Sequence, residues 1–240
     1  MTRFKNILLV LRGKNNEIET AKRAFRLAKT NKAKLTIVDV LDELPKSMKH
    51  YLKIVSAKEL QKIVAEERLS EIQKFINSIQ SGKRIKPIIK TLVGKPYIKI
   101  IQEVLRNKHD LVIKTPEGKG GAKEALFESV DISIMRKCPC AVAMSKPTKS
   151  ENYARILVAV DPDPNDEVKT KLNNDVLELA VSVANSENSE LHIVHAWSLY
   201  GEKALRGPRF RESGKDINKL LQDARNVKKK WLDELLGNYP

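Results

Sequence analysis

Short apolar runs alternate with amphipathic stretches over the first 146 residues of the chain. Five of these runs have the length and composition of buried strands: residues 7–11, 35–41, 85–93, 111–113 and 141–144. Continuous apolar runs are typical of strands that are buried on both faces of a parallel sheet. Because helical stretches separate them, the pattern predicts right-handed crossovers and a doubly wound α/β fold around a five-stranded parallel sheet.

Local signals refine the positions of some of these elements. Pro87 lies within the third run, which favours an edge position for that strand. A glycine-rich loop at 118–121 leads into a helix that is predicted to carry Ala122, Val130 and Ile134. The long helix after the second strand is predicted to present one apolar stripe, made of Leu60, Ile63, Val64, Ile72, Phe75, Ile76 and Ile79.

The strand pattern restarts near residue 153. The segment FKNILLVL at 4–11 matches YARILVAV at 153–160 with a constant offset of 149. The segment LTIVDV at 35–40 matches LHIVHA at 191–196 with an offset of 156. Two strand signals in the same order predict an internal duplication. We therefore expect one domain over residues 1–146, a polar linker over 147–152 and a second domain over 153–240.

The second copy is predicted to be incomplete. A helix between its two strands carries Leu172, Val176, Leu179, Ala180 and Val183, and a last amphipathic helix covers 220–235. Nothing in 153–240 corresponds to the third, fourth and fifth strands of the first copy. A first strand that belongs in the middle of a sheet would then be an exposed edge. We expect domain pairing or a homodimer, in which another copy covers that edge.

Positive charge is concentrated in the first part of the chain. The whole sequence has a formal net charge of +15 at pH 7, whereas residues 1–150 hold 32 of its 45 Lys and Arg but 15 of its 30 Asp and Glu. Such asymmetry occurs in proteins that bind nucleic acid or another anion. The lysines are scattered, however, and no aromatic residues alternate with them to stack on bases. This distribution favours an ordinary solvated surface over a nucleic-acid interface.

Composition excludes several other classes of protein. No apolar run approaches the roughly 20 residues that cross a bilayer, and the apolar stretch after Asn6 is too short for a signal-peptide core. Two cysteines cannot form a disulfide scaffold, and four histidines leave little for a zinc site. We expect a cytoplasmic protein with no inserted membrane segment and no bound metal.

Several segments together resemble the universal stress protein family. They are the repeated ILLV and ILVAVD strands, LTIVDV at the second strand, LFESV at 126–130 and RKCPCAV at 136–142. The duplication and the RKCPC segment are similar to the tandem, E-type members. The resemblance implies a Rossmann-like fold, a cytoplasmic role in stress resistance and a tendency of domains to pair through the fifth strand.

The resemblance also bears on ATP binding. Members that bind ATP carry the motif G-x2-G-x9-G-[ST] after the fourth strand. The LFESV segment aligns this motif with the sequence. The three glycine positions of the motif then fall on Thr115, Gly118 and Glu128, and its final Ser/Thr position falls on Ser129. Glycine is needed where the backbone approaches a phosphate closely. A carboxylate about 4 Å from a phosphate oxygen is repelled by roughly 4 kcal/mol at an effective dielectric of 20. We therefore expect no ATP cofactor.

Other candidates for a nucleotide pocket come from the same resemblance. Gly120 and Gly121 leave open an altered phosphate loop. Members that bind ATP have an aspartate at the end of the first strand, where the first copy has Arg12 and the second has Asp161. Val40 keeps the apolar character expected beside an adenine, although a core valine would look the same. Neither copy carries a complete ATP site.

No motif for catalysis occurs in the sequence. A phosphate loop of the P-loop type, a zinc-protease helix and a nucleophile elbow are all absent. Cys138 and Cys140 are separated by one residue, not by the two typical of redox and zinc motifs. We expect them to pack as small apolar groups, with a redox-active pair as the alternative. His192 and His195 lie three apart in a predicted strand and should face opposite sides.

The favoured hypothesis is a non-catalytic stress-response protein that acts as a binding or interaction module. Its ligand would be a small apolar or anionic molecule. Two alternatives remain open. One is an ATP-binding switch or slow ATPase, and the other is a module that binds anions or nucleic acid through the basic first domain.

Overall fold

The computed structural model describes residues 3–45, 47–48, 55–79, 85–117, 129–146, 153–208, 216–237 and 239. The chain divides into two compact units, Met1–Lys149 and Ser150–Pro240. The predicted linker at 147–152 lies outside the described residues. In the part of the chain that is described, no helix is both long and apolar enough to cross a bilayer.

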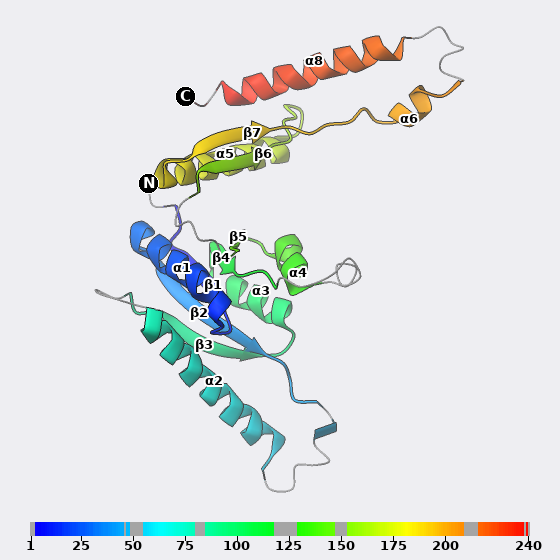
Figure 1. Ribbon diagram of the computed structural model, residues 1–240. Helices are drawn as coiled ribbons and strands as arrows, with labels where there is room; N and C mark the ends of the chain where they lie inside the picture. Colours follow the sequence, from blue (N-terminus) through cyan, green and yellow to red (C-terminus); the bar gives the residue numbers. More distant parts are fainter. Residues whose placement is uncertain are drawn as a thin grey trace. The chain divides into compact units, whose positions relative to one another are not determined.

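A five-stranded parallel sheet forms the centre of the first unit. Its strands are β1 (Asn6–Val10), β2 (Lys34–Leu41), β3 (Ile88–Val93), β4 (Leu111–Lys114) and β5 (Ala141–Met144). They lie in the order β3-β2-β1-β4-β5 (Figure 1). The central strand β1 pairs with β2 on one side and with β4 on the other. The strand order reverses between β1 and β4, and ligands of open α/β sheets bind at such a switch point.

Helices cover both faces of this sheet. They are α1 (Ile18–Asn31), α2 (Ala57–Ile79), α3 (Pro96–Asn107) and α4 (Val130–Lys137). Right-handed crossovers place α1 and α2 on one face and α3 and α4 on the other. Leu8 packs in one core cluster with Ile100 of α3 and Ile134 of α4. Ile7 and Leu9, which point to the opposite face of β1, are also fully buried. The predicted doubly wound sheet is confirmed.

The apolar stripe predicted for α2 is wrong over the first half of the helix. Ile72 and Ile76 are buried, but Ile63 is 49% exposed and Val64 is 38% exposed. The second half packs on the sheet through Ile72 and Ile76, and Phe75 lies so near the loop after β1 that a Cβ added at Gly13 would be 3.7 Å from its side chain. The helical spacing of apolar residues continues beyond the part of the helix that meets the sheet, so periodicity alone could not locate the contact.

Two other predicted boundaries differ from the structure. β3 begins at Ile88, after Pro87, and not at residue 85; its edge position is confirmed. α4 begins at Val130, because Ser129 has an extended backbone and caps the helix; the predicted helical residue Ala122 lies outside the described residues. Residues 118–128, which include the glycine-rich loop, lie outside the described residues.

The second unit contains a smaller parallel pair of strands. Its elements are β6 (Arg155–Ala159), α5 (Glu167–Glu187), β7 (Glu190–Val194), α6 (Glu202–Leu205) and α8 (Ile217–Leu236). Among the described residues, β6 and β7 pair only with each other. A separate core cluster holds Val158, Val160, Leu177, Ala180 and Leu235. The short helix α6 was not predicted.

The two copies of the repeated strand differ in burial. Leu8 is fully buried, whereas Leu157, its counterpart at the offset of 149, is 71% exposed. Val158, which points to the other face of β6, is buried. One face of the β6–β7 pair is therefore covered. In α5, Leu172 of the predicted stripe is 60% exposed, and Leu177, which the prediction omitted, is 1% exposed.

Candidate functional site

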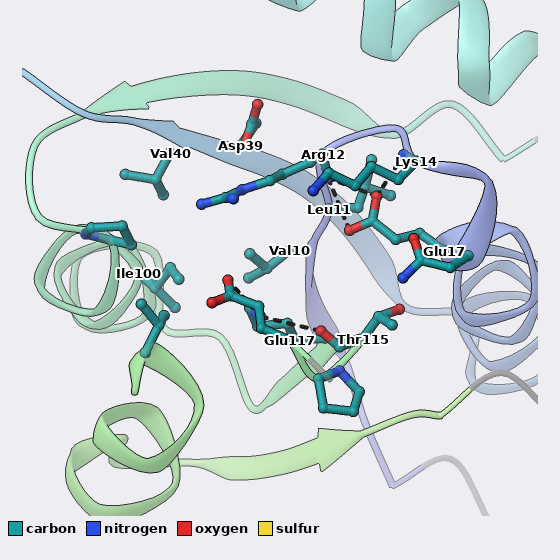
Figure 2. Close-up of a pocket in the computed structure, with 15 residues that line it drawn as sticks. Val10, Leu11, Arg12, Lys14, Glu17, Asp39, Val40, Ile100, Thr115 and Glu117 are labelled. Carbon is teal, nitrogen blue, oxygen red and sulfur yellow. Dashed lines mark hydrogen bonds and ion pairs between the residues drawn. The ribbon is translucent and has the colours of Figure 1, made fainter. Parts of the chain in front are cut away.

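A pocket of about 280 Å³ opens at the carboxyl ends of β1, β2 and β4 in the first unit (Figure 2). This is the switch point of the sheet, where the loops after β1 and β4 diverge to opposite faces. Residues from these loops and from α3 and α4 complete the wall. The lining consists of Val10, Leu11, Arg12, Lys14, Asn16, Glu17, Asp39, Val40, Pro96, Ile100, Lys114, Thr115, Pro116, Glu117 and Val130.

The floor of the pocket is apolar and belongs to the protein core. Val10, Val40 and Ile100 are each less than 9% exposed and are members of one buried cluster. Val130, at the first turn of α4, packs against the same cluster. Because core packing fixes these side chains, the floor is preformed and can accept an apolar group of a ligand.

A buried ion cluster lies beside this floor. Lys114, the last residue of β4, is 6% exposed, and its Nζ lies 2.8 Å from Oδ1 of Asp131 and 3.2 Å from Oε1 of Glu117. The same Nζ donates a hydrogen bond to the carbonyl oxygen of Thr115. Oδ2 of Asp131 accepts a hydrogen bond from the backbone N–H of Glu117. These contacts neutralise the lysine internally and fix the start of the loop that follows β4.

Hydroxyl groups fix the next residue of that loop. Oγ1 of Thr115 donates to Oγ1 of Thr20 at 2.7 Å, and Thr20 donates in turn to the carbonyl oxygen of Ser145. Thr115 and Thr20 are both buried. The chain of hydrogen bonds connects β4, α1 and the end of β5, so the side chain of Thr115 is part of the packed interior.

Carboxylates organise the opposite wall. The buried Glu17 accepts hydrogen bonds from the backbone N–H groups of Arg12 and Lys14, which shapes the loop after β1. Oδ2 of Asp39 accepts a hydrogen bond from Nε of Arg68 at 2.6 Å. Burial works against the charged form of Arg68, but its hydrogen bonds to Asp39 and a neighbouring glutamate raise its pKa above the ordinary value. The Arg68 guanidinium therefore stays charged over the whole physiological pH range.

Arg12 differs from the other charged residues of the pocket. It is exposed, and Figure 2 shows its side chain reaching across the mouth toward Val40. Its backbone bonds to Glu17 and Arg68, but within the described part of the chain its guanidinium has no hydrogen bond or ion pair. It is thus a cation available to a ligand that rests on the apolar floor.

The structure brings together only part of the predicted nucleotide site. Arg12 and Val40 both line the pocket. Ser129 does not line it; its hydroxyl accepts a hydrogen bond from the backbone N–H of Ile132 and caps α4. Asp161 belongs to the second unit, where its carboxylate is exposed and pairs with Lys169 at 2.8 Å. Gly118, Gly120 and Gly121 lie outside the described residues.

Sequence reasoning missed the residues that dominate the electrostatics of the pocket. Lys114, Glu117 and Asp131 look like ordinary surface charges in the sequence. One signal was available, because Lys114 follows directly on the buried run 111–113. A charge at the carboxyl end of a strand next to the switch point is a reasonable candidate for such a site.

The remaining candidates do not extend the site. Among the described residues, no group of three or more His, Cys, Asp or Glu side chains could hold a metal ion. His195 follows β7, which ends at Val194, so it is not inside a strand as predicted; its Nδ1 lies 3.0 Å from the carbonyl oxygen of Val160. Cys138 and Cys140 pack against the core cluster below the pocket.

Comparison with known proteins agrees with this architecture. A model of the universal stress protein family matches residues 3–146. The chain belongs to the universal stress protein family. Several of its relatives are of the E type: a universal stress protein E homolog of Haemophilus influenzae is 27% identical over 218 residues, which are 88% of this chain and 71% of that protein.

A second relative, the universal stress protein E of Photorhabdus laumondii, is 25% identical over 201 residues, or 82% of this chain. The match spans 63% of that protein's own length. Membership of this family assigns the chain to the stress-response proteins.

Solved structures show the same fold. A putative universal stress protein from Pseudomonas aeruginosa UCBPP-PA14 is 20% identical and has a TM-score of 0.55, with 96% of this chain and 71% of that chain covered. A universal stress protein from Archaeoglobus fulgidus has the same identity and TM-score and covers 88% of this chain and 74% of that chain. The Rossmann-like α/β fold predicted from the sequence is confirmed.

Proposed function

We propose that the first unit is a non-catalytic binding module of a stress-response protein, and that its pocket takes a small ligand with an apolar body and one anionic group, not ATP. One observation carries this proposal. The cation buried in the pocket, Lys114, is already neutralised by Asp131 and Glu117. Arg12 is the lining cation that reaches into the mouth (Figure 2).

The size and lining of the pocket support a small ligand. A volume of about 280 Å³ lies just below the range of roughly 300–1,000 Å³ that is typical of small-molecule sites. The floor of Val10, Val40 and Ile100 is apolar, and Arg12 stands at the mouth. A hydrogen bond between a carboxylate and a guanidinium contributes about 1.5–3 kcal/mol, so Arg12 would fix the orientation of an anionic head group.

The polar wall disfavours a triphosphate. A triphosphate needs unpaired cations and free backbone N–H groups, yet Lys114, the buried one of the two lysines that line the pocket, is engaged by two carboxylates. Withdrawing Lys114 toward a phosphate would leave Asp131 buried without a counter-ion, which costs about 3–5 kcal/mol. Thr115 stands at a position where ATP binders have glycine, and its hydroxyl donates a hydrogen bond to Thr20. Glu117 would in addition repel the phosphate oxygens.

The same contacts support a role without catalysis. A general base needs a lone pair that is free to accept a proton from the substrate. In the described lining of the pocket, Glu17 is engaged by backbone N–H groups, Asp39 by Arg68 and Glu117 by Lys114. These contacts favour a structural role for the three carboxylates, and we assign them no part in proton transfer to a ligand.

Isothermal titration of the whole chain with octanoate and with ATP tests this proposal. Octanoate supplies an apolar body and one carboxylate, and we expect it to bind. ATP should give no heat corresponding to a dissociation constant below about 10 μM and no release of phosphate. Arg12→Gln should weaken octanoate binding by about tenfold or more, because it removes one charge-assisted hydrogen bond.

Lys34→Gln is the matched control for this titration. It removes the same charge from an exposed residue at the amino-terminal start of β2, away from the pocket. It should leave octanoate affinity unchanged. Micromolar ATP binding that survives glycine substitution at 115 and 128 would establish the alternative of an altered phosphate loop. Octanoate affinity that is equal in the wild type and in Arg12→Gln would refute the assigned role of Arg12.

A further inference from the structure

The two cysteines of the chain lie next to each other at the end of α4. Cys138 is the C-cap of that helix and has an extended backbone, with φ −72° and ψ 130°. Cys140 immediately precedes β5. The two Sγ atoms are 3.6 Å apart, and both residues are partly exposed. These are the chain's only cysteines, so any disulfide within one molecule must join them.

The contact needs little change to become a covalent bond. The backbone bends at Pro139 and Cys140, and the short Sγ separation shows that the two thiols converge. An S–S bond is about 2.05 Å long. Rotation about the side-chain bonds must therefore bring the sulfur atoms roughly 1.5 Å closer. Both thiols pack against the core cluster, which keeps them in this arrangement.

The two thiols are electrostatically unequal. A hydrogen bond from the Cys140 thiol stabilises the Cys138 thiolate and, against the effect of burial, lowers the pKa of Cys138 to about 6. The same contact, together with burial and the nearby carboxylate of Asp110, raises the pKa of Cys140 above its ordinary value. Because a thiolate is the nucleophilic form of cysteine, Cys138 is reactive at neutral pH while Cys140 stays protonated.

We propose that Cys138 and Cys140 are a redox-active dithiol, which a small hydroperoxide such as hydrogen peroxide oxidises to a disulfide within one chain. The Cys138 thiolate attacks one peroxide oxygen and breaks the O–O bond, which gives a sulfenic acid and, after protonation, water. The Cys140 sulfur then attacks the Cys138 sulfur, and the sulfenic oxygen leaves with the Cys140 proton as a second water. In total, two thiols and one hydrogen peroxide give one disulfide and two waters.

Such a disulfide would be easily reversed. The ring that closes across a single intervening residue is small and strained, and strained disulfides are more readily reduced than structural ones. Dithiols of low molecular weight would therefore restore the reduced form. Reversibility separates this reaction from oxidation to sulfinic or sulfonic acid, which simple thiols do not repair.

The test is peroxide titration of the whole chain, followed by thiol counting and intact mass spectrometry. We expect one equivalent of hydrogen peroxide to remove both thiols, to lower the mass by two hydrogen atoms without dimer formation, and to be reversed by dithiothreitol. In Cys140→Ala, Cys138 should give a sulfenic acid that dimedone traps, and the pH midpoint of its alkylation by iodoacetamide should rise above that of the wild type.

Cys138→Ala is the matched variant, because it removes the proposed nucleophile and leaves Cys140 partly buried and near Asp110. It should react with peroxide more slowly than wild type at pH 7, because burial and the Asp110 carboxylate still act to raise the pKa of Cys140 and so disfavour its thiolate. The proposal is overturned if both thiols survive conditions that consume free cysteine in the same solution. It is also overturned if disulfides form only between chains, or if Cys138→Ala reacts as fast as the wild type.

Discussion

At the scale of single residues, the first unit pairs its buried charges across distant parts of the chain. Lys114 meets Asp131, and Arg68 meets Asp39. A third cluster joins β3 to α3: Glu103 is 4% exposed and accepts a hydrogen bond from Nζ of Lys90 at 2.7 Å. His109 is enclosed beside it, with Nε2 at 3.8 Å from Glu103. A buried charge is tolerated where such partners compensate its desolvation.

His109 should make stability depend on pH. Burial is the largest influence on its pKa and lowers it below 6.5, although the carbonyl of Asn6 and the carboxylate of Glu103 oppose this. The unfolded chain then binds a proton more readily than the folded one as the pH falls through 6.5. The stabilising contribution of neutral His109 is therefore complete above about pH 6.5 and is lost as the pH falls toward its folded pKa.

Urea unfolding between pH 7.5 and 5 measures this dependence. The unfolding free energy of wild type should decrease as the pH is lowered. Below about pH 6.5, the unfolding free energy of His109→Gln should depend less steeply on pH than that of wild type. His192→Gln serves as the control, because that side chain is 53% exposed. Equal slopes in wild type and His109→Gln would contradict the assignment.

The residues of the pocket show how far sequence reasoning reaches at this scale. Arg12 and Val40 were singled out through the family resemblance, which points to the ends of the first two strands, and both line the pocket. The ion pair between Asp131 and Lys114 could not be predicted from the sequence, because it depends on where α4 begins. That start is set by the conformation of Ser129, whereas the apolar spacing had suggested a longer helix. The candidate role of Glu128 remains a prediction, because this residue lies outside the described part of the chain.

At the scale of elements, α4 depends on its first residues. Ser129 caps the helix through the backbone N–H of Ile132, and Asp131 in the first turn binds Lys114. We expect Ser129→Ala to lower the unfolding free energy by about 1 kcal/mol, because a typical N-cap side chain contributes that much. Denaturant unfolding measures the loss, and Ser129→Asn should retain most of the stability because asparagine caps equally well.

Octanoate titration of these two variants separates capping from ligand contact. If Ser129 acts only as a cap, the dissociation constant for octanoate should be the same in wild type, Ser129→Ala and Ser129→Asn. The titration is made under conditions in which all three proteins are fully folded. A large loss of octanoate affinity in Ser129→Ala without a loss of stability would instead show that Ser129 contacts the ligand.

The elements themselves were largely predictable because their signals are local. Buried parallel strands are continuous apolar runs, and four of the five predicted strands of the first unit lie within about one residue of their observed ends. The helix faces were harder to predict. α2 and α5 each carry more apolar residues than the sheet covers, as the exposure of Ile63 and Leu172 shows. Which turn of a helix meets the sheet depends on loop geometry, which periodicity does not contain.

At the scale of the whole molecule, each unit has a core of its own. The cluster around Leu8 and Ile134 lies within the first unit, and the cluster around Val158 and Leu177 lies within the second. β6 and β7 pair in parallel, as β1 and β2 do, and that the second unit is an incomplete duplicate of the first stays a prediction. That another copy covers β6, as domain pairing or a homodimer would require, stays a prediction.

We expect residues 1–149, produced alone, to fold cooperatively. The five-stranded sheet and its four helices are contained in this unit, and a domain of this size buries enough apolar surface to be stable. Thermal unfolding followed by circular dichroism should show one sigmoidal transition. The same fragment with Leu8→Asp should lose this cooperative transition, because a carboxylate in the centre of the core has no partner. A gradual, non-cooperative melt of the wild-type fragment would mean that its stability depends on residues 150–240.

The central place of β1 has a consequence for biosynthesis. The strand is synthesised before the other four strands of its sheet, yet one of its two neighbours, β4, begins at Leu111, about a hundred residues later. Asp110, which accepts hydrogen bonds from the backbone N–H groups of Lys5 and Asn6, is also synthesised about a hundred residues after them. During translation the nascent chain therefore carries a half-sheet of β1, β2 and β3 with one long apolar border uncovered. Pairings of such large sequence separation form slowly, so this intermediate is the stage at which chaperones would have most to protect.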